Sequence, residues 1–148
     1  MNSEFNDANE SPGFLLWQVT AIWQRSIRQA LEPFELTHPQ FVLLYSCHWL
    51  SQQAGRAGIT QVQLAQHARV DVSVTSQVLR TLQKRGLIDR NPHPTDTRAN
   101  LIMVTPVGVD LAKRAVRAVE EADHTFFSTL DDADRDEMIR FMLRLLTH

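Results

Sequence analysis

The chain has 148 residues, of which 43% are hydrophobic and 22% are charged, as expected for one soluble globular domain. No apolar run approaches the roughly 18 residues of a membrane-spanning helix, and residues 1–13 lack the basic and apolar regions of a signal peptide. The single cysteine, Cys47, excludes an intramolecular disulfide. We therefore expect a cytoplasmic protein with no membrane partner.

Charge is distributed unevenly along the chain, although the formal net charge is only −2. Residues 69–98 carry six basic and three acidic side chains, whereas residues 1–68 carry three and five, and residues 99–148 carry six and nine. The positive charge is therefore concentrated in residues 69–98, and we expect this segment to contact the phosphate backbone of a nucleic acid.

Two helices are predicted in the first third of the chain. Ser11-Pro12 is typical of a helix start, residues 14–31 have helical apolar spacing, and Pro33 ends the pattern. Thr37-His38-Pro39 begins a second helix by the same reasoning, and the glycines at 55 and 58 mark the loop that ends it. The predicted apolar stripe of this second helix consists of Phe41, Leu44, Tyr45, His48 and Trp49.

The next segment has the spacing of a helix-turn-helix. Thr60 is a suitable cap for a short helix, 61–68, and Val62, Leu64 and Ala65 are expected to face inward. Residues 69–71 form a turn. A further helix, capped by Asp71 or Ser73, runs to about residue 85 and ends at Gly86. Two helices joined by so short a turn are typical of this motif.

A β-hairpin and two more helices complete the predicted order. Residues 87–90 and 100–105 read as short strands, joined by the Pro-rich loop 91–98, so a wing follows the helix-turn-helix. Thr105-Pro106 opens a long helix to about residue 129. The last helix, 133–146, places Met138, Phe141, Met142 and Leu145 on one stripe.

The predicted fold class is mainly α with a small β-hairpin wing. A winged helix-turn-helix, residues 37–105, is flanked by an N-terminal dimerisation helix, residues 1–36, and by C-terminal dimerisation helices, residues 106–148. The terminal helices are longer and more apolar than a small winged module needs. This surplus indicates an intertwined homodimer interface.

The predicted helix from residue 72 to 85 has one apolar face and one polar face. Val74, Val78, Leu79 and Leu82 follow the helical period and define its expected buried face. The opposite face presents Ser73, Ser76, Gln77, Arg80 and Lys84. Serine, glutamine and arginine can hydrogen-bond base edges in a major groove, whereas Lys84 and Arg85 are better placed for phosphates. An ordinary amphipathic helix with a solvated face has the same pattern.

The sequence resembles the MarR family of winged-helix regulators. The resemblance rests on a series of short motifs that occur in the family's order, at residues 36–41 (LTHPQF), 59–65 (ITQVQLA), 74–82 (VTSQVLRTL), 84–90 (KRGLIDR), 96–99 (DTRA) and 104–108 (VTPVG). It covers roughly residues 14–118.

The resemblance implies a triangular homodimer that binds double-stranded DNA. It places Ser73, Thr75, Ser76, Gln77 and Arg80 in the recognition helix and sends Arg98 from the wing into a minor groove, where negative potential is enhanced. Asp96 would brace the wing loop, although an Asp96–Arg98 pair can also be a plain surface ion pair. Family wings often carry a second basic residue where this chain has Thr97. The predicted DNA-binding set is Ser73, Thr75, Ser76, Gln77, Arg80, Lys84, Arg85, Arg90, Asp96, Thr97 and Arg98.

The resemblance also implies a small-molecule effector. Regulators of this family commonly bind small aromatic or phenolic acids between the dimer helices and the DNA-binding module. The candidate ligand-binding residues are Trp17, Trp23, Arg25, Tyr45 and His48, with Arg28 as an alternative partner for a carboxylate. An aromatic stripe at helical spacing is also what a plain core produces. No cofactor and no metal site are predicted.

Three other functions were compared with a DNA-binding repressor. An enzyme is not expected, because no phosphate-binding glycine loop, HExxH or nucleophile elbow is found. A redox-sensing regulator acting through Cys47 is a second alternative, although a cysteine in an apolar stretch is usually inert. A winged helix that contacts only other proteins is the third alternative.

Overall fold

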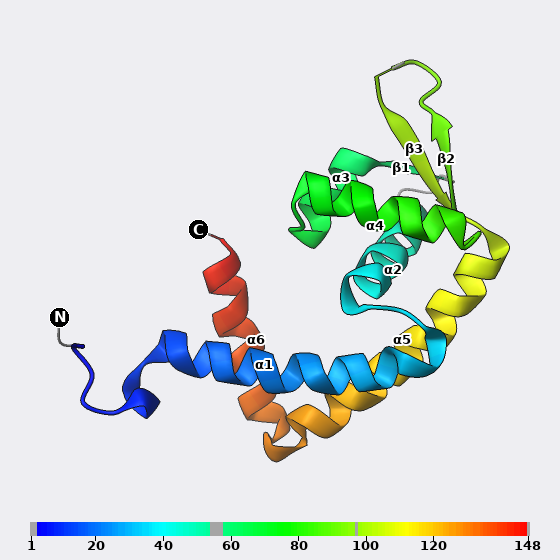
Figure 1. The fold of residues 1–148 in the computed structure, drawn as a ribbon. Helices are drawn as coiled ribbons and strands as arrows, with labels where there is room; N and C mark the ends of the chain where they lie inside the picture. The colour runs from blue at the N-terminus through cyan, green and yellow to red at the C-terminus, as the bar shows by residue number, and fades with distance from the viewer. Residues whose placement is uncertain (1–2, 54–57, 97, 148) are drawn as a thin grey trace.

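The computed structural model describes residues 3–53, 58–96 and 98–147. Its helices are α1 (Pro12–Leu31), α2 (His38–Gln53), α3 (Gln61–Ala68), α4 (Val72–Lys84), α5 (Pro106–Phe126) and α6 (Asp132–Leu146) (Figure 1). Its strands are β1 (Ile59–Thr60), β2 (Ile88–Pro92) and β3 (Asn100–Val104), and short 3₁₀ turns lie at Ala8–Glu10, Glu32–Phe34 and Phe127–Thr129. The predicted fold class, mainly helical with a small β-hairpin wing, is confirmed.

Helix ends are set by the capping residues that the sequence predicts. Ser11 accepts a hydrogen bond from the Phe14 amide at the start of α1. Thr60 and Gln63 form a reciprocal capping box at α3. After α4, Gly86 takes a left-handed conformation with φ of 73°, which favours glycine. These local interactions explain why the boundaries of the helix-turn-helix agree with the sequence pattern.

The sheet has three antiparallel strands in the order β1-β3-β2, and the sequence predicts only two of them. The missing strand, β1, is two residues long, and Ile59 pairs with Ile102 of β3. So short a strand shows no alternation of apolar and polar residues that could reveal it. β1 continues directly into α3, so it joins the first helix of the motif to the hairpin.

A single core lies around α2 and joins every element of the winged module to α1 and α5. Its fully buried side chains include Ile27, Leu31, Leu43, Leu44, Leu64, Leu79, Leu82 and Ile102. Two inward assignments were wrong, because Val62 is 55% exposed and Val74 is 42% exposed. On α4, Leu79 and Leu82 are buried as predicted and Val78 is partly buried, whereas Thr75 takes the buried place assigned to Val74. Trp49, assigned to the inner stripe of α2, is likewise 41% exposed.

Gly108 fixes how α5 leaves the hairpin. A Cβ atom at this position would lie 2.1 Å from the carbonyl oxygen of Leu87 and 2.8 Å from Cγ1 of Val104. The same carbonyl accepts a 3.0 Å hydrogen bond from the Thr105 amide. The first turn of α5 is therefore held against the start of β2 by a backbone contact that only glycine permits.

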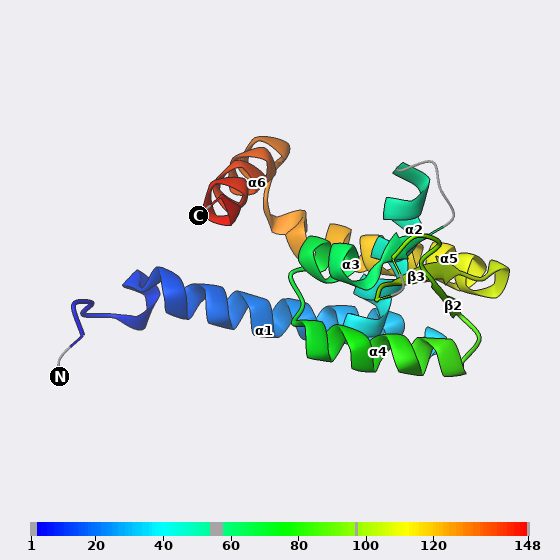
Figure 2. The same ribbon diagram turned by 90° about the horizontal axis from the view of Figure 1, so that it is seen from above.

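The terminal helices extend beyond the winged module. In both views the N-terminal half of α1 extends away from α4 and the hairpin (Figures 1 and 2). The C-terminal end of α6 reaches the end of α3, where Nη2 of Arg69 donates a 3.1 Å hydrogen bond to the carbonyl oxygen of Leu146. No residue of α6, which the structure describes in full, is buried. In the described part of the chain, no helix combines the length and apolar character needed to cross a membrane.

Candidate nucleic-acid interface and pocket

The solvent-facing side of α4 carries the polar residues that the sequence assigns to base contacts. Ser73, Gln77 and Arg80 are exposed, and Ser76 is half-buried. Asp71 caps the helix and accepts hydrogen bonds from both the amide and the hydroxyl of Ser73. These hydrogen bonds lower the pKa of the Asp71 carboxyl, so the cap is ionised at neutral pH. Beyond this cap, the solvent-facing side of α4 is polar, and its charged side chains are the cations Arg80 and Lys84.

Thr75 does not belong to this face. Its side chain is fully buried, because residue 75 lies one helical turn before Leu79 on the inner stripe. Its hydroxyl oxygen has no hydrogen-bond partner among the described residues. The assignment of Thr75 to direct DNA contact is therefore wrong, and its place is in the packing of α4.

Arg85 is also engaged within the protein rather than free for phosphate. Its Nη1 donates a 2.6 Å hydrogen bond to the carbonyl oxygen of Glu35, and its Nη2 donates a 3.3 Å bond to that of Phe34. These contacts tie the end of α4 to the connection between α1 and α2. Lys84, the neighbouring cation, is exposed.

Arg98, in the loop of the wing, is almost completely exposed to solvent. The side chain of Arg98 is 94% exposed, and its Nε lies 3.8 Å from Oδ1 of Asp96. The same carboxylate oxygen accepts a 3.0 Å hydrogen bond from the Arg98 amide. Asp96 therefore fixes the backbone from which Arg98 projects, as expected. Thr97 lies outside the described residues.

Arg90 has a different place from the rest of the predicted set. Its Nη2 donates a 2.8 Å hydrogen bond to Oε1 of Gln61, the first residue of α3. Arg90 is half-buried as a result. Its guanidinium therefore links strand β2 of the hairpin to the start of α3.

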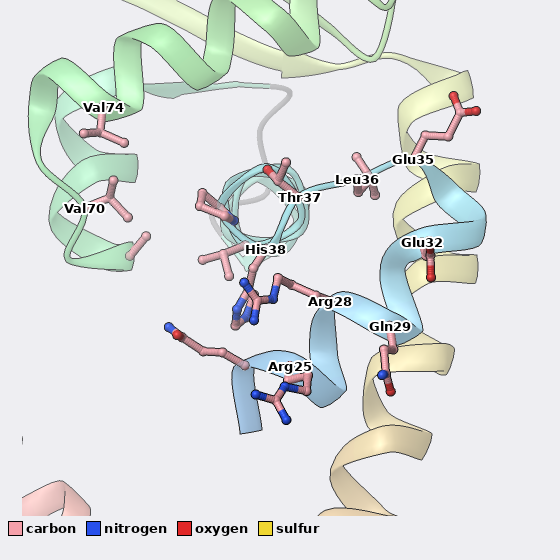
Figure 3. Close-up of a pocket in the computed structure, with 14 residues that line it drawn as sticks. Arg25, Arg28, Gln29, Glu32, Glu35, Leu36, Thr37, His38, Val70 and Val74 are labelled. Atoms are coloured by element: carbon pink, nitrogen blue, oxygen red, sulfur yellow. The ribbon is translucent and has the colours of Figure 1, made fainter. Parts of the chain in front are cut away.

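A cavity of about 870 Å³ lies between α1, the start of α2 and the turn that joins α3 to α4. Arg25 and Arg28 of α1 and His38 of α2 line one side, and Val70 and Val74 line the other (Figure 3). Burial lowers the pKa of His38, an effect that Asp123 opposes and Arg28 reinforces. The imidazole is therefore neutral at pH 7. The charged side chains of the lining are Arg25 and Arg28 together with Glu32 and Glu35.

Of the five residues predicted to bind a ligand, Arg25 alone is among those that line this cavity. Trp17 is 73% exposed on α1. Trp23 donates a 2.7 Å hydrogen bond from Nε1 to Oδ1 of Asp123. Tyr45 stacks on Phe41 with ring centroids 5.9 Å apart. Three of the four remaining candidates thus have other roles in the packing or on the surface.

The fourth, His48, packs beside Tyr45 rather than in the cavity. Its pKa is lowered by partial burial and by the nearby charge of Lys113. The cavity residues that were not predicted to bind a ligand include His38, Val70 and Val74. They lie on three different segments, so no single helical stripe contains them.

Cys47 is fully buried, and its Sγ lies 3.7 Å from the carbonyl oxygen of Ile102. Burial raises the pKa of the thiol to about 12, and a hydrogen bond with Ser51 only partly opposes this. The thiolate is the reactive form of cysteine. The structure therefore argues against a redox-sensing role for Cys47.

Comparison with known proteins agrees with this arrangement. Residues 36–99 match the sequence profile of the MarR family. The chain is 39% identical over 147 residues to the HTH-type transcriptional regulator YdcH of Bacillus subtilis, covering 99% of this chain and 97% of that protein. It is 33% identical over 139 residues to the HTH-type transcriptional repressor Rv2887 of Mycobacterium tuberculosis, covering 93% and 96%.

A solved structure shows the same fold. The structure of the MepR–DNA complex from S. aureus superposes with a TM-score of 0.82 at 25% identity, covering 93% of this chain and 97% of that one. The similarity to YdcH spans nearly the whole of both chains, and the matched profile covers α2, the helix-turn-helix and the first strand of the hairpin. The protein belongs to the MarR family of winged-helix transcriptional regulators.

Proposed function

We propose that the protein binds a pseudo-palindromic DNA operator as a homodimer and represses transcription, and that a small aromatic or phenolic acid modulates this binding. The single observation that carries the proposal is the exposed polar face of α4 together with Arg98 in the wing, whose side chain is 94% exposed. Both are features of a surface that can meet a major groove and the adjacent minor groove.

In this proposal α4 is the recognition helix. Ser73, Ser76, Gln77 and Arg80 contact base edges, and Gln77 and Arg80 have the geometry for bidentate bonds to adenine and guanine. Lys84, at the far end of the helix, contacts phosphate. Arg98 enters the minor groove from a loop that Asp96 braces.

The homodimer is supported by the apolar faces of the terminal helices. Large apolar side chains are 37–73% exposed on both α1 and α6, which is more than a soluble monomer usually leaves uncovered. They are Phe14, Leu15, Leu16, Trp17, Val19 and Ile22 on α1, and Ile139, Phe141, Met142, Leu143, Leu145 and Leu146 on α6. A second copy of the chain would cover these faces and place two copies of α4 about 34–36 Å apart, one turn of B-DNA.

The cavity between α1 and the α3–α4 turn is the proposed effector site. Arg25 and Arg28 supply cations for a carboxylate, and Val42, Val70 and Val74 supply an apolar wall for a ring. Because the lining comes from both the dimer helix and the helix-turn-helix, a ligand can favour one relative position of the two. The effector then shifts the population of dimers away from the spacing that fits DNA.

Repression is proposed over activation, because a dimer bound to its operator can block a promoter without any further contact. The name of Rv2887, a repressor with 33% identity, is consistent with this. A winged helix that contacts only other proteins is the competing function, and salt dependence separates the two. Contacts to phosphate release counterions, so DNA affinity falls steeply with salt.

The test is fluorescence anisotropy with DNA from upstream of the protein's own gene and with random DNA, at two salt concentrations. Wild type is compared with Arg80→Ala and Arg98→Ala, and with Arg117→Ala, which removes an exposed cation from α5. The proposal expects a steep salt dependence, a loss of roughly fivefold or more for the first two variants, and no change for the third. Wild-type protein without salt-dependent binding to either DNA would support the protein-contact function instead.

A further inference from the structure

The loop of the wing is organised around one histidine, His93. Its Nδ1 accepts 3.2 Å hydrogen bonds from the amides of both Thr95 and Asp96, and it lies 3.3 Å from the hydroxyl of Thr95. One ring nitrogen thus accepts hydrogen bonds from two consecutive backbone amides, those of Thr95 and Asp96. This is the arrangement by which aspartate or asparagine side chains usually hold a turn.

His93 is itself fixed by its neighbours. Proline stands on either side of it, and the residue before a proline is restricted to extended backbone. Its amide donates a 3.1 Å hydrogen bond to the carbonyl oxygen of Ala99, which closes the loop from the other side. The imidazole is therefore held where the turn needs an acceptor.

A chain of contacts leads from His93 to the exposed arginine. His93 orients the Asp96 amide, and the Asp96 carboxylate in turn accepts a 3.0 Å hydrogen bond from the amide of Arg98. The amide of Ala99 also donates to the Asp96 carbonyl oxygen at 3.1 Å. The direction in which Arg98 leaves the hairpin thus depends on Asp96, and the position of Asp96 depends on His93.

We infer that His93 is a positioning residue for DNA recognition, whose neutral imidazole organises the wing and whose protonation releases Arg98 from its presented position. The inference rests on the proposed role of Arg98 at the minor groove. A neutral ring with its proton on Nε2 can accept at Nδ1, whereas a protonated ring has a donor at both nitrogens. Protonation therefore turns the Nδ1 contacts with two amides from attraction to repulsion.

The charges around His93 favour the same change. The other ionisable side chains of the hairpin are Asp89 and Arg90 on β2, and Asp96 and Arg98 in the loop, while β3 has none. Arg90 is bonded to Gln61 of α3. A protonated His93 would compete with Arg98 for the carboxylate of Asp96. Histidine is the side chain whose charge ordinarily changes between about pH 5 and 8.

Two substitutions separate this role from simple charge. His93→Asn keeps an acceptor near the Nδ1 position but does not titrate, and His93→Ala removes the acceptor. At about pH 8 we expect His93→Asn to bind operator DNA like wild type, and His93→Ala to bind roughly three- to tenfold more weakly. On acidification to about pH 5.5, wild type should lose roughly three- to tenfold more affinity than His93→Asn.

His67→Asn, which removes a histidine of α3, serves as the matched control and should keep the wild-type pH profile. Plain electrostatics predicts the opposite sign, because a protonated histidine in the wing adds positive charge facing DNA. The inference is overturned if wild type and His93→Asn share one pH profile, or if wild type gains affinity relative to His93→Asn in acid.

A second measurement does not need DNA. Long-range ¹H–¹⁵N correlation spectra of the free protein at about pH 8 should show the His93 proton on Nε2 and none on Nδ1. A proton on Nδ1 would overturn the inference even if the protein binds DNA. If the tautomer is as expected but Arg98→Ala leaves DNA binding intact at every pH, the proposed function of the wing fails instead.

Discussion

Arg85, at the end of the recognition helix, donates a 2.6 Å hydrogen bond to the backbone carbonyl of Glu35, in the connection between α1 and α2. Glu35 has a left-handed backbone with φ of 54°, an uncommon conformation for a residue other than glycine. The arginine therefore joins α4 to the point where the dimer helix meets the winged module. The sequence predicts that Arg85 contacts phosphate, but in the structure it connects α4 to the segment between α1 and α2.

Arg85→Ala should accordingly lower stability more than it changes salt-dependent DNA binding. Loss of two charge-assisted hydrogen bonds on a partly exposed surface is expected to cost about 1–2 kcal/mol of unfolding free energy. Lys84→Ala is the matched control and should leave stability within about 0.5 kcal/mol while reducing the salt slope by about one. Urea unfolding and anisotropy titrations measure the two effects. The opposite pattern would return Arg85 to the phosphate-contacting set.

Gly108→Ala tests the contact between α5 and β2. Its Cβ would lie 2.1 Å from the backbone oxygen of Leu87, which cannot move without disturbing the sheet. We expect a loss of about 1–3 kcal/mol in unfolding free energy. Gly13→Ala in α1 has nothing within 4 Å of the added atom, so it should instead stabilise the protein by up to about 1 kcal/mol. Equal effects in urea unfolding would contradict this account of Gly108.

Sequence reasoning succeeded wherever a local interaction decides the outcome. The caps at Ser11, Thr60 and Asp71 and the left-handed Gly86 each depend on residues within one turn of the chain. The helix-turn-helix and the hairpin therefore lie where the pattern predicts them. The order of the elements followed from these boundaries.

Sequence reasoning failed where the packing of distant segments determines which residues are buried. Val74 and Thr75 are neighbours on α4, and which of them is buried depends on how α4 is rotated against α2. The apolar character of valine favoured the wrong one. Most of the lining of the cavity was missed for the same reason, because His38, Val42 and Val70 come together only in three dimensions. Aromatic residues of α1 and α2 were predicted to bind a ligand, but Trp23, Tyr45 and His48 pack within the protein instead.

Acid should destabilise the fold through His38. Burial lowers its pKa in the native state, so the unfolded chain binds the proton more readily. Stability is then fully present above the ordinary histidine pKa of about 6.5 and falls as the pH drops below it. His38→Gln should have a shallower fall in melting temperature between about pH 7 and 5 than wild type. Identical slopes for the two proteins would rule out a contribution from His38.

The apolar face of α6 should be required for the dimer. Leu145 is 61% exposed, and Leu145→Glu would place a charge in the proposed interface. We expect this variant to dissociate at micromolar concentration and to lose operator affinity, because burying an unpaired charge is costly. Asp136→Asn, on an exposed position of the same helix, is the control and should remain dimeric. Sedimentation equilibrium reports the outcome, and a dimeric Leu145→Glu would count against the α6 interface.

The two arginines of the cavity should decide whether it accepts an acid. With 4-hydroxybenzoate as the probe, Arg25→Ala and Arg28→Ala are each expected to weaken binding by roughly tenfold or more, the cost of one charge-assisted contact. Val74→Phe should also block binding, because it fills the apolar wall without removing charge.

His48→Asn is the matched control for the cavity, since His48 was a sequence candidate but does not line it. Calorimetry on the free protein measures affinity for the probe, and release of labelled operator DNA measures its effect. Because Val70 and Val74 belong to the helix-turn-helix while the arginines belong to α1, a bound acid that releases DNA must change the relation of these two parts. Binding that His48→Asn abolishes and Arg28→Ala leaves intact would move the effector site away from this cavity, toward the aromatic cluster of α2.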